Sequence, residues 1–184
     1  MLKKEKCIET QYAYQGKVVS LRLEKVEVQN GNTATREIVE HCGGVCVAAM
    51  NEQGEIYLVR QYRRPLDDFM LELPAGKLEK GEDPLEGAKR ELKEETGNVA
   101  QNFVFLGADY VSPGYCTEKI YVYFATDLTQ EDASPDEDEF VETYKYSLDK
   151  LVDMVMSGEI YDAKTVIGIL KVKTYLENKG GRKA

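Results

Sequence analysis

One short segment in the middle of the chain constrains the fold most, because it predicts a helix with both ends defined. Asp83 is a favourable N-cap residue, Pro84 suits the first helical position, and Glu86 stands where a capping box requires it. Gly97 suits the left-handed conformation that ends many helices. The sequence therefore predicts a helix over 84–96.

Three carboxylates crowd one side of this predicted helix. Glu91 and Glu95 are i,i+4 neighbours, and Glu94 follows Glu91 by three positions. Like charges at this spacing destabilise an isolated helix by roughly 0.2–0.5 kcal/mol per pair. The cluster is either a solvated acidic face, interspersed with Lys and Arg, or a site for a hard cation such as Mg²⁺, which prefers oxygen ligands.

Alternating and continuous apolar runs on both sides of the helix predict strands and further helices. The expected strands span 17–28, 33–40 after an Asn30-Gly31 turn, 45–50, 56–61, 69–73, 103–110, 119–126 and 140–146, and the expected late helices span 148–157 and 163–177. The runs 45–50 and 56–61 are expected to pair as a hairpin. This order of elements predicts an α+β fold with a mixed β-sheet sandwiched between helices. We expect an N-terminal β extension over 1–42 and the main domain over 43–184.

Composition narrows the classes of function. A net charge of −9 argues against a nucleic-acid partner, and no apolar run is long enough to span a membrane. The basic start of the chain lacks the apolar stretch of a secretory signal. A single histidine, His41, leaves no His-based zinc cluster. We expect a cytoplasmic protein whose four cysteines are buried or half-buried free thiols, namely Cys7, Cys42, Cys46 and Cys116.

The wider segment around the predicted helix resembles the signature of the Nudix hydrolase family. Every fixed polar and glycine position of that signature is matched, at Gly76, Glu82, Arg90-Glu91-Leu92, Glu94-Glu95 and Gly97. One position departs, because Asn98 stands where an apolar packing residue is usual. The resemblance implies the Nudix fold and hydrolysis of a nucleoside diphosphate linked to another group.

The resemblance also implies a metal site. Glu91 and Glu95 would hold Mg²⁺, with Mn²⁺ as an alternative, and the backbone carbonyl of Ala75 would complete the site. Arg90 would pair with the glutamates and orient them, so that Arg90 and Glu94 count among the catalytic candidates.

A late acidic loop resembles the one that supplies a catalytic glutamate in this family. Glu139 is the expected catalytic residue and a further metal ligand, with Glu137 as the alternative. It would orient or deprotonate the attacking water.

Further segments resemble the ADP-ribose pyrophosphatase group of this family. Pro113 stands sixteen residues after Gly97, where that group has a marker proline. Arg36 and Glu37 would lie near the adenine, and Arg63 near the diphosphate, because a guanidinium binds phosphate oxygens with two hydrogen bonds. The expected substrate-binding residues are Arg36, Glu37, Arg63, Ser112 and Glu118.

The resemblance leaves the substrate open within limits. ADP-ribose, cleaved to AMP and ribose 5-phosphate, is the leading prediction, followed by a related nucleoside diphosphate-sugar. NADH, another nucleoside diphosphate derivative, or a non-catalytic Nudix ligand sensor are the alternatives. A homodimer built on the N-terminal strands is expected for the group, although 17–28 could equally be the edge strand of a monomer. The segment Asp162-Ala163-Lys164-Thr165 resembles the start of the last helix in these enzymes, with a capping and packing role.

Overall fold

The computed structural model describes residues 1–134 and 140–181. They divide into two compact units, one made of residues 1–43 with 110–119 and the other of 44–109 with 120–184.

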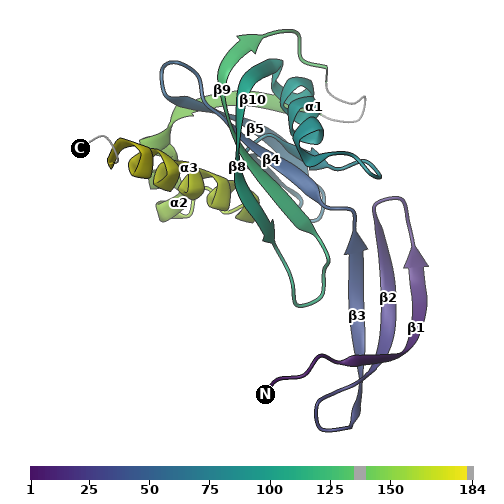
Figure 1. Cartoon of the computed structure of the whole chain (residues 1–184). Coiled ribbons are helices and arrows are strands. Elements are labelled where there is room, and N and C mark those ends of the chain that lie inside the picture. Colours follow the sequence, from purple (N-terminus) through teal and green to yellow (C-terminus); the bar gives the residue numbers. More distant parts are fainter. Residues whose placement is uncertain (135–139, 182–184) are drawn as a thin grey trace. The chain divides into compact units, whose positions relative to one another are not determined.

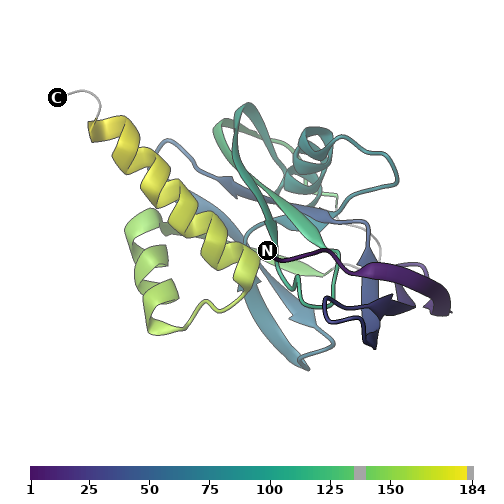
Figure 2. The same ribbon diagram turned by 60° about the horizontal axis from the view of Figure 1, so that its bottom comes forward.

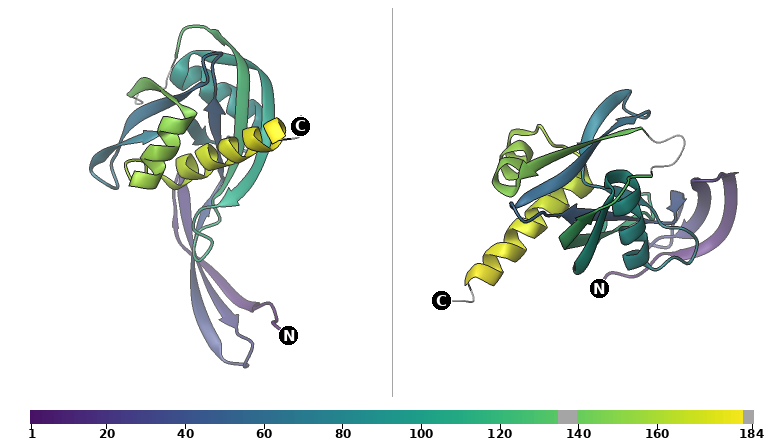
Figure 3. Two further views of the ribbon diagram at one scale, coloured as in Figure 1. Left: turned by 90° about the vertical axis from the view of Figure 1, so that its left-hand side faces the viewer. Right: turned by 90° about the horizontal axis from the view of Figure 1, so that it is seen from above.

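The first unit is built on a three-stranded antiparallel sheet (Figures 1 and 3). Its strands are β1 (Lys6–Gln15), β2 (Val19–Glu27) and β3 (Thr33–His41), in the order β1-β2-β3. The predicted turn joins β2 to β3, since Gly31 has a φ of 84° and its N–H donates to the Val28 carbonyl at 2.9 Å. The alternative that 17–28 forms an edge strand is wrong, because β2 lies between two partners.

The second unit contains two sheets. One has the order β7-β4-β9-β8 and comprises β4 (Gly44–Ala49), β7 (Ala75–Lys77), β8 (Asn98–Tyr110) and β9 (Lys119–Gln130). The other has the order β10-β5-β6 and comprises β5 (Glu55–Arg63), β6 (Asp68–Glu72) and β10 (Val141–Ser147). Since β4 pairs parallel with β9 and antiparallel with β7, the first of these sheets is mixed, as predicted.

The expected hairpin between 45–50 and 56–61 is wrong. A single bridge, Met50 to Ile56, links the two segments, and β4 and β5 then enter different sheets. The Asn51 side chain turns the chain between them by accepting from the N–H groups of Gln53 and Glu55 at 3.0 and 2.9 Å. A strand that is apolar without alternation suits the interior of a sheet covered on both faces, and all of β4 is buried there.

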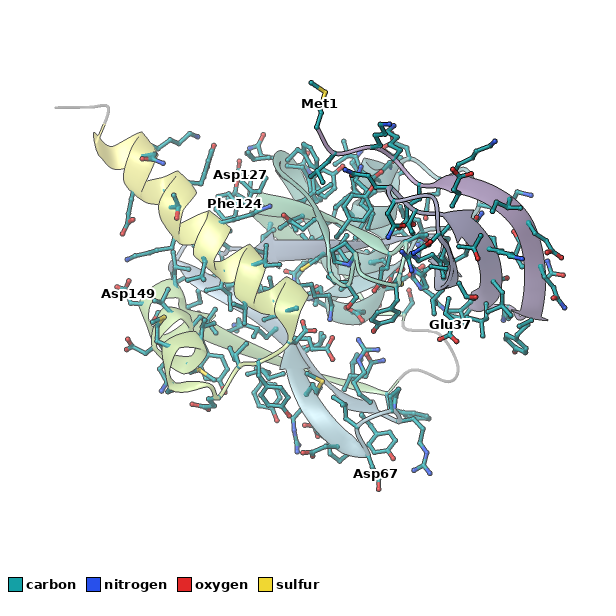
Figure 4. The ribbon with its side chains drawn as sticks, turned by 90° about the horizontal axis from the view of Figure 1, so that it is seen from below. Met1, Glu37, Asp67, Phe124, Asp127 and Asp149 are labelled. Atoms are coloured by element: carbon teal, nitrogen blue, oxygen red, sulfur yellow. The ribbon has the colours of Figure 1, made fainter. Side chains whose placement is uncertain are left out.

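Helices cover both faces of the mixed sheet (Figure 1). On one face, α1 (Pro84–Thr96) packs Ala88 and Leu92 into a core with Val45, Val47 and Tyr123. On the other face lies α3 (Ala163–Gly181), where Phe124 of β9 meets the Tyr175 ring at 5.9 Å between centroids (Figure 4). Helix α2 (Leu148–Ser157) lies beside α3 (Figure 2). The predicted sandwich of sheet and helices is confirmed.

None of the helices in the described ranges is both long enough and apolar enough to cross a membrane.

The ends of α1 are those that the sequence predicts. The Asp83 carboxylate accepts from the N–H groups of Leu85 and Glu86, and Gly97 ends the helix with a φ of 70°. The Glu86 carboxylate accepts from Lys89 at 2.7 Å on the exposed side of the helix and not from the Asp83 N–H, so the Glu86 half of the expected capping box is not formed. These local signals place α1 correctly without tertiary information.

Asn98, the departure from the family signature, is a buried polar residue at 1% exposure. Its side-chain amide donates to the Thr96 hydroxyl oxygen at 2.9 Å. The position is therefore a packing position, as expected, whose polar group is satisfied locally.

All four cysteines are free, but Cys7 and Cys42 are exposed, contrary to expectation. Both lie in the first unit, whose sheet buries few residues. Cys46 lies in the buried strand β4, and burial raises the pKa of its thiol to about 12.

Candidate functional site

Helix α1 directs two of its carboxylates at the short strand β7. Glu91 and Glu95 are 7% and 3% exposed. The Glu95 Oε2 atom accepts from the Ala75 N–H at 3.0 Å. The structure thus brings together Ala75, Glu91 and Glu95, the three expected metal ligands that lie in its described part.

Gly76 lets the backbone of β7 approach these carboxylates closely. A Cβ at this position would lie 1.9 Å from both Cδ and Oε1 of Glu91, far inside any real contact. Glycine is required here for lack of space, and as a result the backbone of β7 lies directly against the Glu91 side chain.

Arg90 ties the acidic side chains together. Its Nη1 donates to Glu91 Oε1 at 2.8 Å and to Glu94 Oε2 at 2.9 Å. Its Nε donates to Glu82 Oε1 at 3.0 Å, and its Nη2 donates to the Lys77 carbonyl at 3.1 Å. The carboxylates of Glu82, Glu91 and Glu94, with Glu82 the largest cause, raise the pKa of Arg90 above its usual value. The arginine and the glutamates of the signature therefore form one network.

The donor set fits a hard divalent cation by its chemistry. Carboxylates and a backbone carbonyl are the oxygen ligands that Mg²⁺ prefers, and carboxylates buried at close quarters call for positive charge. In the described part of the chain no three Asp, Glu, His or Cys side chains already converge as a metal cluster. Glu91 and Glu94 instead turn toward Arg90, so a cation would compete with that guanidinium for their oxygens.

The two candidates of the late acidic loop, Glu139 and Glu137, lie outside the described residues. The chain that leads into the loop is attached to the C-terminal end of α1. Glu131 N–H donates to the Gly97 carbonyl at 2.7 Å, and Ser134 N–H donates to the Glu94 carbonyl at 3.1 Å.

Arg63 belongs to a second cluster of charged groups. Its Nε and Nη2 atoms each donate to one oxygen of Glu72, both at 2.7 Å, and Glu72 is 1% exposed. Lys164 also donates to Glu72, and it donates to Asp162 at 2.9 Å. Two cationic and two anionic side chains therefore alternate, in the order Arg63, Glu72, Lys164 and Asp162.

The electrostatics of this cluster keep Glu72 and Lys164 charged. Burial raises the pKa of Glu72, but the hydrogen bond from Arg63 and the charge of Lys164 outweigh burial and leave the pKa below its usual value. Burial likewise lowers the pKa of Lys164, and the nearby carboxylates of Glu72 and Asp162 reverse that shift, so the pKa is raised.

Sequence reasoning found only part of this second cluster. Asp162 caps α3 as predicted, since its Oδ2 accepts from the Thr165 N–H at 3.0 Å. The contact between Lys164 and Glu72 was not predicted. One signal was present, because a lysine in the first turn of a helix opposes the helix dipole and so needs a partner.

The side chains of Arg36 and Glu37 lie on opposite faces of the first unit's sheet. Arg36 lies opposite Glu24 in the register and Glu37 lies opposite Leu23, as expected for consecutive strand residues (Figure 4 labels Glu37). Arg36 Nε donates to Glu5 at 3.0 Å. Their joint role near an adenine stays a prediction, with the constraint that their side chains do not share a face.

Ser112 and Glu118 lie in the loop that runs beside β3. The Ser112 carbonyl accepts from the Cys116 N–H at 2.9 Å, which closes the turn around Pro113. Glu118 Oε1 lies 3.4 Å from His41 Nδ1. With Arg36 and Glu37, these candidates belong to the first unit.

Comparison with known proteins adds to this geometry. Residues 40–165 match the family model described as NUDIX domain. The chain is 44% identical to an ADP-ribose pyrophosphatase of Bacillus subtilis (strain 168), with 94% of this chain and 96% of the relative covered. It is 43% identical to a methanol dehydrogenase activator of Bacillus methanolicus, with 95% and 97% covered. A crystal structure of an ADP compounds hydrolase matches with a TM-score of 0.87 at 24% identity, covering 98% of each chain, which shows the shared fold.

Proposed function

This chain belongs to the Nudix family, and on that basis we propose that it is a pyrophosphohydrolase that cleaves ADP-ribose to AMP and ribose 5-phosphate. Related nucleoside diphosphate-sugars are secondary substrates. The observation that carries the proposal is the contact of Ala75 and Gly76 with the buried carboxylates of Glu91 and Glu95. The choice of ADP-ribose is supported by the Bacillus subtilis relative, which is named for that activity.

The acidic network has a clear chemical use in such a reaction. Glu91, Glu95 and the Ala75 carbonyl would hold Mg²⁺, with Mn²⁺ as the alternative. When bound, such an ion neutralises phosphate charge and lowers the pKa of a coordinated water. Arg90 keeps the carboxylates of Glu91 and Glu94 oriented through its hydrogen bonds at 2.8 and 2.9 Å.

We assign the remaining candidates on the same basis. Glu139 is proposed as catalytic base and further metal ligand. Arg63 is proposed to bind the diphosphate, because Glu72 occupies only its Nε and one side of Nη2 and leaves other N–H groups for phosphate oxygens. Arg36 and Glu37 are proposed to bind the adenine, and Ser112 and Glu118 are proposed as further substrate-binding residues.

We further propose a homodimer in the cytoplasm. Val26 is the only buried residue on β1, β2 and β3, all of which are described. Ile8, Tyr12 and Tyr14 of β1 are 52%, 44% and 59% exposed. A three-stranded sheet with so little buried surface is stabilised by packing against another layer, which a second copy can supply. Light scattering at working concentration checks this, and a monomer would contradict it.

The deciding experiment is a substrate panel with Mg²⁺ and with Mn²⁺. ADP-ribose, ADP-glucose, GDP-mannose, NADH and diadenosine polyphosphates are compared by initial rate, and the products are separated by chromatography. We expect the highest kcat/KM for ADP-ribose, with AMP as a product. A strong preference for NADH would support the alternative enzyme, and inactivity on the whole panel would support a ligand sensor.

Glu91→Gln and Glu95→Gln test the site itself. Each should lower kcat by about 10³-fold or more while the protein stays folded, because a neutral amide is a weaker ligand for a divalent ion. Glu86→Gln is the matched control, since Glu86 lies on the same helix and pairs with Lys89 on its exposed side. Near-normal turnover in either site variant would refute the assignment.

A second candidate comes from the Bacillus methanolicus relative, named as a methanol dehydrogenase activator, whose identity of 43% nearly equals that of the first relative. We propose the test of adding this protein to a methanol dehydrogenase assay. An accelerated rate that is lost in Glu95→Gln would favour that role and would link it to hydrolysis.

A further inference from the structure

We propose that Lys164 is the positioning residue of Arg63, acting through Glu72, and that it thereby sets the affinity of the protein for the substrate's diphosphate. The inference rests on the proposed function of Arg63 as a diphosphate-binding residue. Lys164 has no part in the reaction itself.

The geometry is that of a relay from helix α3 to strand β5. Lys164 lies in the first turn of α3, and its ammonium donates to Glu72 Oε2. Arg63, near the end of β5, takes both oxygens of the same carboxylate at 2.7 Å. Lys164 is 15% exposed whereas Arg63 is 38% exposed, so the lysine lies behind the carboxylate and the guanidinium reaches the surface.

Charge explains why the second cation matters. A guanidinium paired one to one with a buried carboxylate is electrically neutral as a unit and attracts a diphosphate only weakly. Lys164 shares the negative charge of Glu72, which restores a positive field at Arg63. Asp162 makes the four side chains neutral in sum, but its carboxylate lies at the N-terminal end of α3, where its Oδ2 accepts from the Thr165 N–H at 3.0 Å. The partial positive charge of that helix end offsets part of the charge of Asp162.

The N-terminal end of α3 also binds the backbone that connects the Arg63 cluster to the carboxylates of α1. The Leu73 N–H donates to the Thr165 hydroxyl oxygen at 2.9 Å. Leu73 follows Glu72 directly and stands two residues before Ala75, whose N–H donates to Glu95. The start of α3 therefore fixes Glu72 at the point where the chain passes from the Arg63 cluster to the carboxylates of α1.

The experiment measures kcat and KM for ADP-ribose with Mg²⁺ in the full-length protein. We expect Lys164→Met to raise KM by about tenfold and to change kcat by less than about threefold, because a binding contact is weakened and the reacting groups are untouched. Lys164→Arg, which keeps the charge, should restore much of the lost affinity. Lys171→Met is the matched control on α3, since Lys171 pairs with Asp109 at 2.6 Å away from the cluster.

A double-mutant cycle with Glu72→Gln tests whether Lys164 acts through Glu72. It also supplies a variant that should fold if Lys164→Met alone does not. In the double variant the buried Glu72 carboxylate is removed together with its lysine, and Asp162 still accepts from the Thr165 N–H, so the protein should fold. If Lys164 acts through Glu72, adding Lys164→Met to Glu72→Gln should change KM by less than about twofold. A tenfold effect that persists in the Glu72→Gln background would overturn the inference.

The remaining outcomes separate this inference from the proposed function. A wild-type protein inactive on every substrate would refute the proposed function. An active wild type, a raised KM in Arg63→Met and an unchanged KM in Lys164→Met would refute the inference alone. An unchanged KM in Arg63→Met would remove the role of Arg63 and with it the inference.

Discussion

The contact of Gly76 with Glu91 makes a sharp prediction for the variant Gly76→Ala. The new Cβ would lie 1.9 Å from the Glu91 Cδ and Oε1 atoms, whereas ordinary contact begins near 3.4 Å. The carboxylate must therefore retreat by about 1.5 Å, since a packed interior gives little elsewhere. Glu91 is also held by Arg90 at 2.8 Å, so its retreat disturbs the whole acidic network.

The expected cost falls on catalysis more than on stability. Misplacement of a catalytic group by about 1 Å can cost about 100-fold in rate, so we expect kcat to fall by about that factor at saturating Mg²⁺. The displaced group is the end of a flexible side chain, so the loss of unfolding free energy should stay below about 2 kcal/mol. Half-saturation by Mg²⁺ should move to higher concentration.

The assay is steady-state hydrolysis of ADP-ribose over a Mg²⁺ titration, with thermal unfolding measured on the same samples. Gly180→Ala is the control, because a Cβ at Gly180 meets nothing within 4 Å. A Gly76→Ala protein with kcat within about threefold of wild type and an unchanged Mg²⁺ dependence would refute the reasoning.

Three further predictions concern stability, each measured by urea unfolding. Arg90→Met should lower the unfolding free energy by about 3 kcal/mol, because it leaves several acceptor carboxylates without their cation; an unchanged midpoint would contradict this. The pKa of Glu82, through its hydrogen bond from Arg90, and that of Glu72, where Arg63 outweighs burial, lie below the usual 4.5. Their stabilisation is therefore complete above about pH 4.5 and should be lost as pH falls through the lowered folded values; constant stability down to about pH 3 would contradict this. Gly168→Ala would bring its Cβ 2.5 Å from Leu73 Cδ1 and should cost about 1–2 kcal/mol, unlike Gly180→Ala.

The sequence predicts those elements whose determinants are local. The limits of α1 follow from Asp83 and Gly97, and those of α2 from its own apolar periodicity, so the predictions of 84–96 and 148–157 agree with the structure. Strand β1 was missed although Ile8, Tyr12 and Tyr14 fall on alternate positions, with Glu9 and Gln11 on the other side of the strand.

Pairing across long separations was beyond local reasoning. The segments 45–50 and 56–61 are close in sequence, yet β4 pairs with β9, more than seventy residues away in the chain. A short turn is compatible with a hairpin and with a change of sheet, and only the packing of the whole unit decides between them.

In the candidate site, too, features set by local sequence could be predicted, and contacts between distant segments could not. The carboxylates of α1 could be located from their helical spacing, and Arg90 contacts three of the glutamates in the signature. The contact between Lys164 and Glu72 was not predicted, because the two residues are 92 apart in the sequence and meet only in the folded chain. The opposite faces of Arg36 and Glu37 could have been read from strand alternation alone.

The contrast between the buried and exposed cysteines gives the chain a built-in probe of its own opening. Thiol reagents attack the thiolate, so Cys46, enclosed in β4 with its pKa raised to about 12, is protected while the core is closed. Cys7 and Cys42 are open to reagent in the native fold. The fourth free thiol, Cys116, is half-buried and is replaced by serine for this measurement. Once Cys7 and Cys42 have been blocked, the labelling rate of Cys46 reports how often the central sheet opens, and a bound nucleotide that stabilises the closed sheet would slow the labelling.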